Sequence, residues 1–232
     1  MSAHTPAHAR GSVGSVIVDS PTSAGLGRLV VDAADAPVAA LWLGHGAGGG
    51  IDAVDLAALA RALPALGVTV LRFEQPWRVA GRRVAARPPV LDAAWVDTVP
   101  LVAEIVGELP LFAGGRSAGA RVACRTAASA GAAGVVALAF PLHPPGRPEK
   151  SRLEELLTPS VPVLVLQGTR DTFGTAGTIS AEAEGHPDVR VVAVEGADHG
   201  MKVLKAGPLT PRQVADQVTG SVREFIRSVV GS

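Results

Sequence analysis

Apolar and polar positions along this chain repeat with two periods, one typical of strands and the other of helices. Short apolar runs rich in β-branched residues predict strands, and longer stretches with apolar residues three or four positions apart predict helices. Strands are predicted at 15–20, 27–32, 37–46, 68–73, 109–115, 134–140, 161–168 and 189–196. Helices are predicted at 52–66, 92–108, 118–130, 152–157, 176–184 and 211–229. This alternation predicts an α/β fold in which helices cover both faces of a mostly parallel sheet.

Three segments depart from the simple alternation. The first two strands are joined by a short connection of Pro, Gly and Ser residues, which predicts an antiparallel pair. Pro100 lies inside the predicted helix 92–108, where it should kink the helix or mark a restart. The stretch 76–90, rich in Pro and Arg, is expected to be a long surface loop. Since the chain shows neither a linker nor an internal repeat, we expect one domain over residues 1–232, with a flexible tail at 1–12.

The stretch GRSAG lies where a predicted strand ends and a predicted helix begins. Gly115 and Gly119 flank Ser117 and permit a sharp, strained turn that larger side chains would crowd. Such a turn presents the Ser117 hydroxyl beyond the end of the sheet as a candidate nucleophile. It also leaves the Ala118 N–H free at a helix start, where it can donate to an oxyanion. A glycine-rich connection that carries a structural serine is the alternative interpretation.

Two further stretches place an acid and a base at the same edge of the predicted sheet. Asp171 ends VPVLVLQGTRD, just beyond a predicted strand, and His199 occupies the equivalent place in VRVVAVEGADHG. Ligands of open α/β sheets bind outside the carboxyl ends of the strands, so both side chains are expected near Ser117. Serine needs a general base, and the base needs an acid that holds its tautomer. The chain order Ser, Asp, His therefore predicts a triad, while Asp198 is a poor acid because it would have to fold back onto its neighbour.

The stretch LGHGAGGG, residues 43–50, follows an early strand. Its glycines let backbone N–H groups point freely, and we expect the Ala47 N–H to be the second oxyanion donor, with Gly48 in reserve. The run could also be a phosphate-binding loop, but it lacks the lysine of a P-loop and the spacing of a dinucleotide-binding loop. We expect the His45 imidazole to fix this loop by hydrogen bonding.

Composition narrows the function classes. Of the 232 residues, 47% are apolar and 18% are charged, which is typical of a globular protein. The 21 basic and 21 acidic side chains cancel and aromatic residues make up only 3%, which argues against nucleic-acid binding. The single cysteine, Cys124, excludes an intramolecular disulfide, and we expect its side chain to be buried and packed in the interior rather than reactive. We find no signal-peptide core and no apolar run near ~18 residues, so a cytoplasmic protein without membrane spans is expected.

The whole pattern resembles the α/β-hydrolase superfamily from Leu41 to the C-terminal helix. More narrowly, it is similar to small predicted hydrolases related to the dienelactone-hydrolase and testis-expressed-protein types. The stretches that carry the resemblance are LGHGAGG, LRFEQPWRVAGRR, GGRSAGARVA, FPLHPPGRPEKSR, LQGTRDTFG and GADHGMKV. The resemblance implies that Ser117 is the nucleophile, His199 the general base and Asp171 its orienting acid. Dienelactone hydrolases use a cysteine nucleophile, so the serine argues against a dienelactone substrate but not against ester chemistry.

The resemblance also bears on the access of substrate. Members of the superfamily often insert a helical lid before the strand that leads to the acid, but here the interval 141–160 holds at most one short helix. We therefore expect an open, uncapped site. Arg116, His45 and His143 are further candidates for contact with substrate. The arginines of the Pro- and Arg-rich stretch are expected to be solvated rather than to bind an acidic substrate; they are Arg78, Arg82, Arg83 and Arg87.

These observations predict a serine hydrolase that acts on esters of small carboxylic acids without a metal or an organic cofactor. Its partner is then a small-molecule ester. Two alternatives remain open. The fold could be retained as a non-catalytic interaction module, because a fold does not guarantee a function. The same triad could also cleave thioesters or transfer acyl groups.

Overall fold

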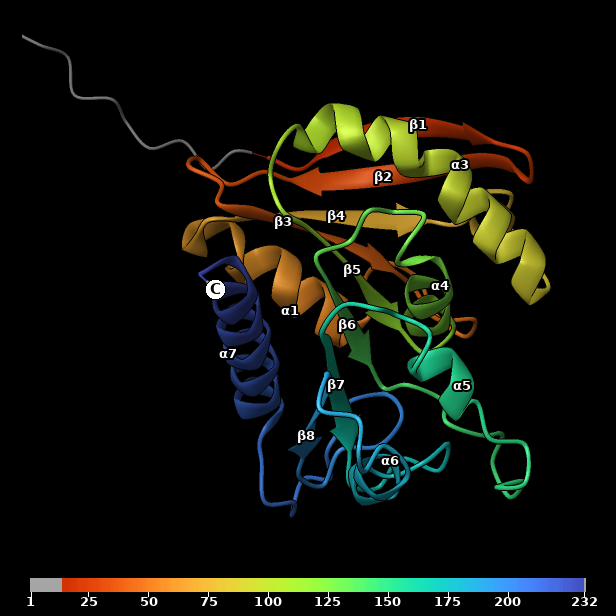
Figure 1. Cartoon of the computed structure of the whole chain (residues 1–232), viewed down its shortest axis with the longest axis vertical. Coiled ribbons are helices and arrows are strands. Elements are labelled where there is room, and N and C mark those ends of the chain that lie inside the picture. The colour runs from red at the N-terminus through yellow and green to blue at the C-terminus, as the bar shows by residue number, and fades with distance from the viewer. Residues whose placement is uncertain (1–13, 232) are drawn as a thin grey trace, which may run out of the picture.

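One eight-stranded sheet forms the centre of the molecule, in the order β1-β2-β4-β3-β5-β6-β7-β8 (Figure 1). The computed structural model describes residues 14–231, so the predicted tail at 1–12 lies outside the described residues. The strands are β1 (Val16–Thr22), β2 (Gly25–Asp32), β3 (Ala39–Gly44), β4 (Val68–Glu74), β5 (Leu111–Arg116), β6 (Gly134–Leu138), β7 (Val163–Gly168) and β8 (Val189–Val194). β1 pairs antiparallel with β2, and β2 with β4, whereas all later pairs are parallel. The mostly parallel sheet and the antiparallel first pair are therefore confirmed.

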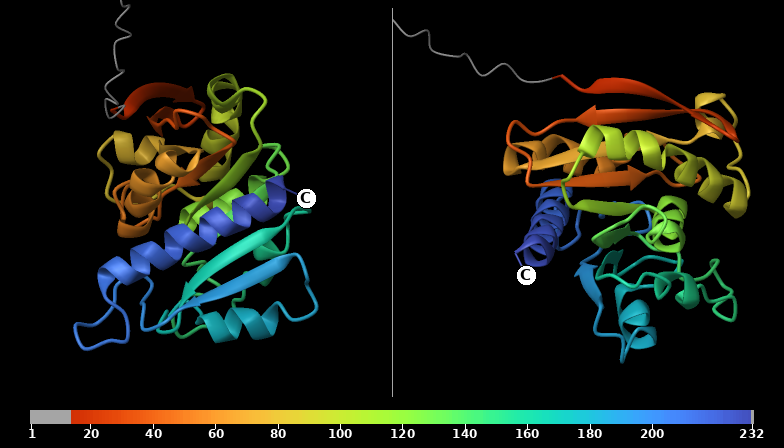
Figure 2. Two further views of the ribbon diagram at one scale, coloured as in Figure 1. Left: turned by 90° about the vertical axis from the view of Figure 1, so that its left-hand side faces the viewer. Right: turned by 45° about the horizontal axis from the view of Figure 1, so that its top comes forward.

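Helices lie on both faces of this sheet, as predicted. They are α1 (Val54–Ala62), α2 (Pro76–Val79), α3 (Pro88–Val106), α4 (Ala118–Thr126), α5 (Leu153–Leu156), α6 (Ala176–Glu182) and α7 (Pro211–Val230), with a 3₁₀ turn, η1, at Pro64–Leu66. In Figure 1, α1 and α7 lie on one side of the sheet and α3, α4 and α5 on the other. Figure 2 shows α7 running across its face of the sheet.

The period of two along β3 explains how one strand serves both layers. Leu41 and Leu43 belong to the apolar cluster that includes α1 and α7, while Trp42 belongs to the cluster that includes α3. Trp42 stacks on Trp95 of α3, with ring centroids 3.7 Å apart. Because all three β3 side chains are fully buried, this strand is held from both sides, and the loop that follows it starts from a fixed point.

The prediction of a surface loop over 76–90 is wrong at both of its ends. Its first four residues form α2, and α3 begins at Pro88. Proline suits the first turn of a helix because the N–H that it lacks has no partner there. Trp77, only 5% exposed, anchors the segment in the core. The four arginines of the segment are exposed, as expected; they are Arg78, Arg82, Arg83 and Arg87.

Two other helix predictions need correction. α3 continues through Pro100 as one helix, so the chain does not restart there. Pro100 cannot donate to the Val96 carbonyl, but both residues are exposed, and water can hydrogen-bond that carbonyl instead. The helix predicted at 118–130 ends earlier, at Thr126, and its last residues form turns.

The segment between β6 and β7 contains α5, a helix of four residues, and no larger insertion. The absence of a helical lid, expected from the length of the interval 141–160, is therefore confirmed. Among residues 14–231, none of the helices is both long enough and apolar enough to span a membrane.

Candidate active site

Ser117 lies at the turn between β5 and α4, in a backbone conformation that residues other than glycine rarely adopt. Its φ is 52° and its ψ is −112°. The turn is held on both sides, because the Ser117 N–H donates to the Leu138 carbonyl at 3.0 Å and the Arg121 N–H donates to the Ser117 carbonyl at 3.2 Å. Such strain persists only where the surroundings over-determine the conformation. The turn therefore aims the Ser117 side chain out of the edge of the sheet.

The two glycines of the turn are required by close backbone packing. A Cβ atom on Gly119 would lie 2.3 Å from the Gly44 carbonyl oxygen, and one on Gly115 would lie 2.6 Å from the same oxygen. Both distances are far below van der Waals contact, so a side chain at either position would force β3 and the start of α4 apart. The glycines of GRSAG thus bring the end of β3, with its glycine-rich loop, directly against Ser117.

Ser117, His199 and Asp171 form one continuous chain of hydrogen bonds. His199 Nε2 lies 2.9 Å from Ser117 Oγ. His199 Nδ1 lies 2.8 Å from Asp171 Oδ2. Because a carboxylate oxygen only accepts, Nδ1 carries the proton in neutral His199 and Nε2 faces the serine as an acceptor. The structure thus brings together the three residues that the sequence placed at separate strand ends.

The carboxyl group of Asp171 is buried and fully engaged. The residue is 2% exposed. Its Oδ1 accepts from the Phe173 N–H at 2.8 Å, and its Oδ2 accepts from Gln167 Nε2 at 2.9 Å as well as from His199. Gln167 also donates to the Gly174 carbonyl at 2.7 Å. These bonds satisfy the buried carboxylate and fix the plane in which it meets the imidazole.

Sequence reasoning missed both Gln167 and Phe173. The Phe173 ring stacks on the His199 imidazole, with centroids 4.1 Å apart and planes inclined by 29°. Gln167 is the last residue but one of β7 and is fully buried, so a polar side chain in the run VPVLVLQG was the available signal. Phe173 follows the candidate acid by two residues, but nothing in its local pattern indicates which way the ring points.

The turn that carries His199 is shaped by its neighbours. Asp198 Oδ1 accepts from the Gly200 N–H at 2.7 Å and from the Lys202 N–H at 3.0 Å. A Cβ atom on Gly168, at the end of β7, would lie 2.3 Å from the Ala197 carbonyl oxygen. Gly168 therefore lets the two strand-end loops touch, and Asp198 closes the turn instead of contacting the imidazole.

The loop after β3 lies directly beside Ser117. A Cβ atom on Gly46 would lie 3.4 Å from Ser117 Cβ and 4.0 Å from its Oγ. Ala47 and Gly48 are exposed, and Ala118 is half-buried. Among residues 14–231, neither the Ala47 N–H nor the Ala118 N–H has a hydrogen-bond acceptor. Two free donors thus flank the serine, and their role as an oxyanion hole stays a prediction.

His45 is buried and ties the same loop to the neighbouring strand. It is 3% exposed. The Gln75 N–H donates to His45 Nε2 at 3.1 Å, and His45 Nδ1 donates to the Gly46 carbonyl at 2.9 Å. Burial lowers the pKa of His45 below its ordinary value, the nearby Arg78 guanidinium acts in the same direction, and the Gly46 carbonyl opposes both. Its neutral form holds the loop.

This environment predicts how stability depends on pH. Unfolded His45 binds a proton more readily than folded His45, so its contribution to stability is complete above the unfolded pKa of 6.5 and is lost as the pH falls below it. We expect chemical denaturation to show a smaller loss of unfolding free energy between pH 7.5 and pH 5.5 in His45→Gln than in the wild type. His186→Gln, at an exposed histidine, is the matched control. Equal pH dependence in wild type and His45→Gln would contradict the prediction.

Three other candidates have different surroundings. The Arg116 guanidinium is engaged inside the protein, where it donates to the His199 carbonyl and pairs with Asp55. His143 is half-buried, with Nδ1 2.9 Å from the Pro144 carbonyl oxygen. Cys124 is fully buried, and burial raises the pKa of its thiol to about 12. The His, Cys, Asp and Glu side chains of residues 14–231 form no group of three that could hold a metal ion.

Comparison with known proteins agrees with this fold. Residues 37–227 match a family model described as an alpha/beta hydrolase domain. A lidless α/β serine hydrolase from Xanthomonas campestris superposes with a TM-score of 0.70 at 19% identity, covering 95% of this chain and 98% of that one. Est1E from Butyrivibrio proteoclasticus gives 0.72 at 14% identity, covering 95% and 100%. Esterase 2 from Thermogutta terrifontis, phosphoramylated by tabun in its structure, gives 0.70 at 16% identity, covering 97% and 98%.

Proposed function

The chain belongs to the alpha/beta hydrolase domain family, and we propose that it is a serine hydrolase that cleaves carboxylic esters of small substrates. The observation that carries the proposal is the unbroken hydrogen-bond chain from Asp171 through His199 to Ser117. The strained turn at Ser117 adds to it, because strain of this kind is characteristic of functional sites. The described part of the chain has no lid over this edge of the sheet, which fits small ester substrates.

The proposed reaction begins with attack of Ser117 Oγ on the ester carbonyl carbon. His199 Nε2 accepts the hydroxyl proton as the new bond forms, and Asp171 stabilises the resulting imidazolium. The negative charge moves to the carbonyl oxygen, where the N–H groups of Ala118 and Ala47 would donate to it. His199 then gives its proton to the departing alkoxide, and the alcohol leaves an acyl group on Ser117.

Water completes the cycle by the same steps. His199 Nε2 takes a proton from a water molecule while the water oxygen attacks the acyl carbon. The second tetrahedral intermediate collapses, His199 returns the proton to Ser117 Oγ, and the carboxylic acid is released. Asp171 keeps the proton of His199 on Nδ1 throughout, so that Nε2 can both accept and donate.

The first test is covalent labelling with an alkyl fluorophosphonate. An activated serine attacks phosphorus and displaces fluoride, so we expect one adduct per chain, located on the peptide that contains Ser117 by tandem mass spectrometry. Heat-denatured protein is the control and should stay unlabelled, because the hydrogen-bond chain exists only in the fold. A folded wild type that stays unlabelled, or that is labelled at another serine, would overturn the proposal.

A further inference from the structure

The side chain of Arg116 joins three segments that are far apart in the sequence. Arg116 is the last residue of β5 and directly precedes Ser117. Its Nη2 donates to the backbone carbonyl of His199. Its Nε lies 3.5 Å from Asp55 Oδ2, at the start of α1. The guanidinium therefore links three places: the turn at Ser117, the turn at residues 198–202 that carries His199 (the histidine turn), and the start of α1.

Asp55 supplies the counter-charge for this arginine in an apolar setting. The Asp55 side chain is 0% exposed and that of Arg116 is 15% exposed. Asp55 Oδ1 accepts from the Leu56 N–H at 3.0 Å, whereas Oδ2 has no hydrogen-bond donor among residues 14–231 and lies 3.5 Å from Arg116 Nε. Burial raises the pKa of Asp55, and Arg116 opposes that rise. Arg116 is the largest of the influences that favour an ionised carboxylate at this position.

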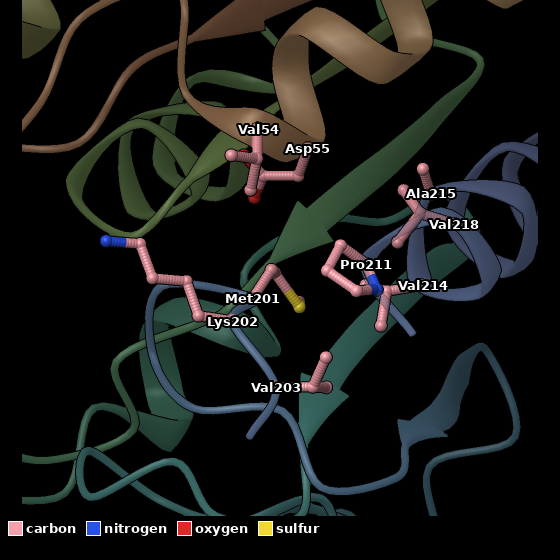
Figure 3. A pocket seen from close by; sticks show the side chains of 9 residues that line it. All are labelled: Val54, Asp55, Met201, Lys202, Val203, Pro211, Val214, Ala215 and Val218. Atoms are coloured by element: carbon pink, nitrogen blue, oxygen red, sulfur yellow. The ribbon is translucent and has the colours of Figure 1, made fainter. Parts of the chain in front are cut away.

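Within residues 14–231, Asp55 is the one carboxylate that pairs with Arg116. Asp55 lies at the edge of a pocket of about 310 Å³ between α1, the histidine turn and α7 (Figure 3). Lys202 is the one other charged residue in the lining, and it is also a cation. The pocket is lined by Val54, Asp55, Met201, Lys202, Val203, Pro211, Val214, Ala215 and Val218. Arg116 is thus the residue that forms an ion pair with Asp55 within residues 14–231.

Arg116 also holds the backbone of His199 through a hydrogen bond to its carbonyl. Within residues 14–231, its bond to the His199 carbonyl is the one hydrogen bond that the His199 backbone makes. The imidazole is fixed at its ring by Asp171 and Phe173, and the turn is closed beyond it by Asp198. Arg116 is therefore the one group in the described chain that holds the His199 backbone directly, beside the bonds of Asp198 that close the turn.

We propose that Arg116 and Asp55 are positioning residues that hold the His199 backbone so that Nε2 meets Ser117 Oγ. The inference rests on the proposed serine-hydrolase function and deepens it. Asp55 orients the guanidinium, the guanidinium holds the carbonyl, and the carbonyl sets the distance between base and nucleophile. Arg116, predicted to contact substrate, then acts through His199 instead. Hydrolysis depends steeply on that distance, since a displacement near 1 Å costs about 100-fold in rate.

The test compares Arg116→Met, Asp55→Asn and the double variant in hydrolysis of a short-chain aryl ester. We expect Arg116→Met to lower kcat by about 10- to 100-fold, with KM changed by less than about threefold, because the lost contact lies behind the base. Arg116→Met leaves Asp55 buried without a partner, so its melting temperature should also fall. The double variant removes that charge and should regain most of the melting temperature but not kcat.

The control is Arg125→Met. Arg125 is a similarly buried arginine on α4, 19% exposed, that pairs with Asp92 and Glu155 and makes no contact with the triad. It should lower the melting temperature and leave kcat within about twofold. Recovery of kcat together with the melting temperature in the double variant would contradict the positioning role. So would a rise of KM in Arg116→Met with an unchanged kcat.

Two further outcomes separate this inference from the proposed function. Fluorophosphonate labelling of the wild type together with unchanged labelling rates in Arg116→Met would overturn positioning and leave the hydrolase proposal standing. A wild type that does not label would overturn the hydrolase proposal itself. In that case a crystal structure of Arg116→Met still decides the geometry: we expect His199 Nε2 beyond hydrogen-bond reach of Ser117 Oγ, and an unchanged distance would refute the inference.

Discussion

Ser117→Ala is expected to lower kcat for a short-chain aryl ester by about 10⁵-fold or more. The variant keeps His199, Asp171 and the free backbone donors, but it removes the atom that forms the acyl bond. The remaining rate should come from water activated beside the oxyanion donors and should show no burst of product. Steady-state kinetics with rapid-mixing measurement of the burst checks this result. A kcat within tenfold of the wild type would show that another nucleophile carries the reaction.

Substitutions of Ser117 are also expected to change the stability of the fold, because its backbone conformation is strained. Alanine at 117 keeps a Cβ atom at a φ of 52°, so the strain of the turn stays. Ser117→Gly removes that Cβ atom and should therefore have a higher free energy of unfolding than Ser117→Ala. Relief of the strain contributes roughly 1 to 3 kcal/mol, from which the greater entropy of unfolded glycine is subtracted. Chemical denaturation of the two variants measures the difference. A Ser117→Gly variant less stable than Ser117→Ala by the full entropy difference, about 0.4 to 1 kcal/mol, would show that the backbone at this turn is not strained.

The order of elements and the strand-end positions of the site follow from local patterns. The strands that lead to the glycine-rich loop, to Ser117 and to Asp171 are apolar runs that are buried on both faces, and such runs can be recognised without knowledge of the neighbours. The edge strand that leads to His199 is only partly buried, but its β-branched residues still identify it as a strand. The glycines of GRSAG indicate a close approach of backbones, and the structure supplies the partner, the carbonyl of Gly44. The sequence therefore predicted Ser117, Asp171 and His199 at one edge of the sheet. In the structure, hydrogen bonds join these three side chains.

The parts that sequence missed are those decided by contacts between distant segments. The stretch 76–90 was predicted as a loop because its prolines and arginines suggest solvent, yet Trp77 anchors it and Pro88 starts a helix. Phe173 stacks on His199 through a loop geometry that no periodicity encodes. Arg116 was predicted to contact substrate, but it pairs with Asp55 of α1 instead. Only the packing of α1 against the end of β5 reveals this partner.

Asp171→Asn is expected to lower kcat by about 10⁴-fold while KM changes little. Asp171 accepts three hydrogen bonds through its two oxygens, from His199, Gln167 and the Phe173 N–H. An asparagine has one oxygen and one NH₂ group, so at least one of these donors must face another donor. If the NH₂ group faces His199, Nδ1 must become an acceptor, and the proton moves to Nε2, where it blocks removal of the proton from Ser117.

Asp198→Asn is the matched control, since Asp198 directly precedes His199 and is also hydrogen-bonded. Its Oδ1 accepts from the Gly200 and Lys202 N–H groups, and an asparagine oxygen can accept the same two bonds. We therefore expect kcat within about threefold of the wild type, because no charge on Asp198 acts through a contact with the imidazole. The pH dependence of kcat/KM for both variants completes the comparison. A large loss in Asp198→Asn with a small one in Asp171→Asn would exchange the roles of the two aspartates and break the link between the hydrogen-bond chain and catalysis.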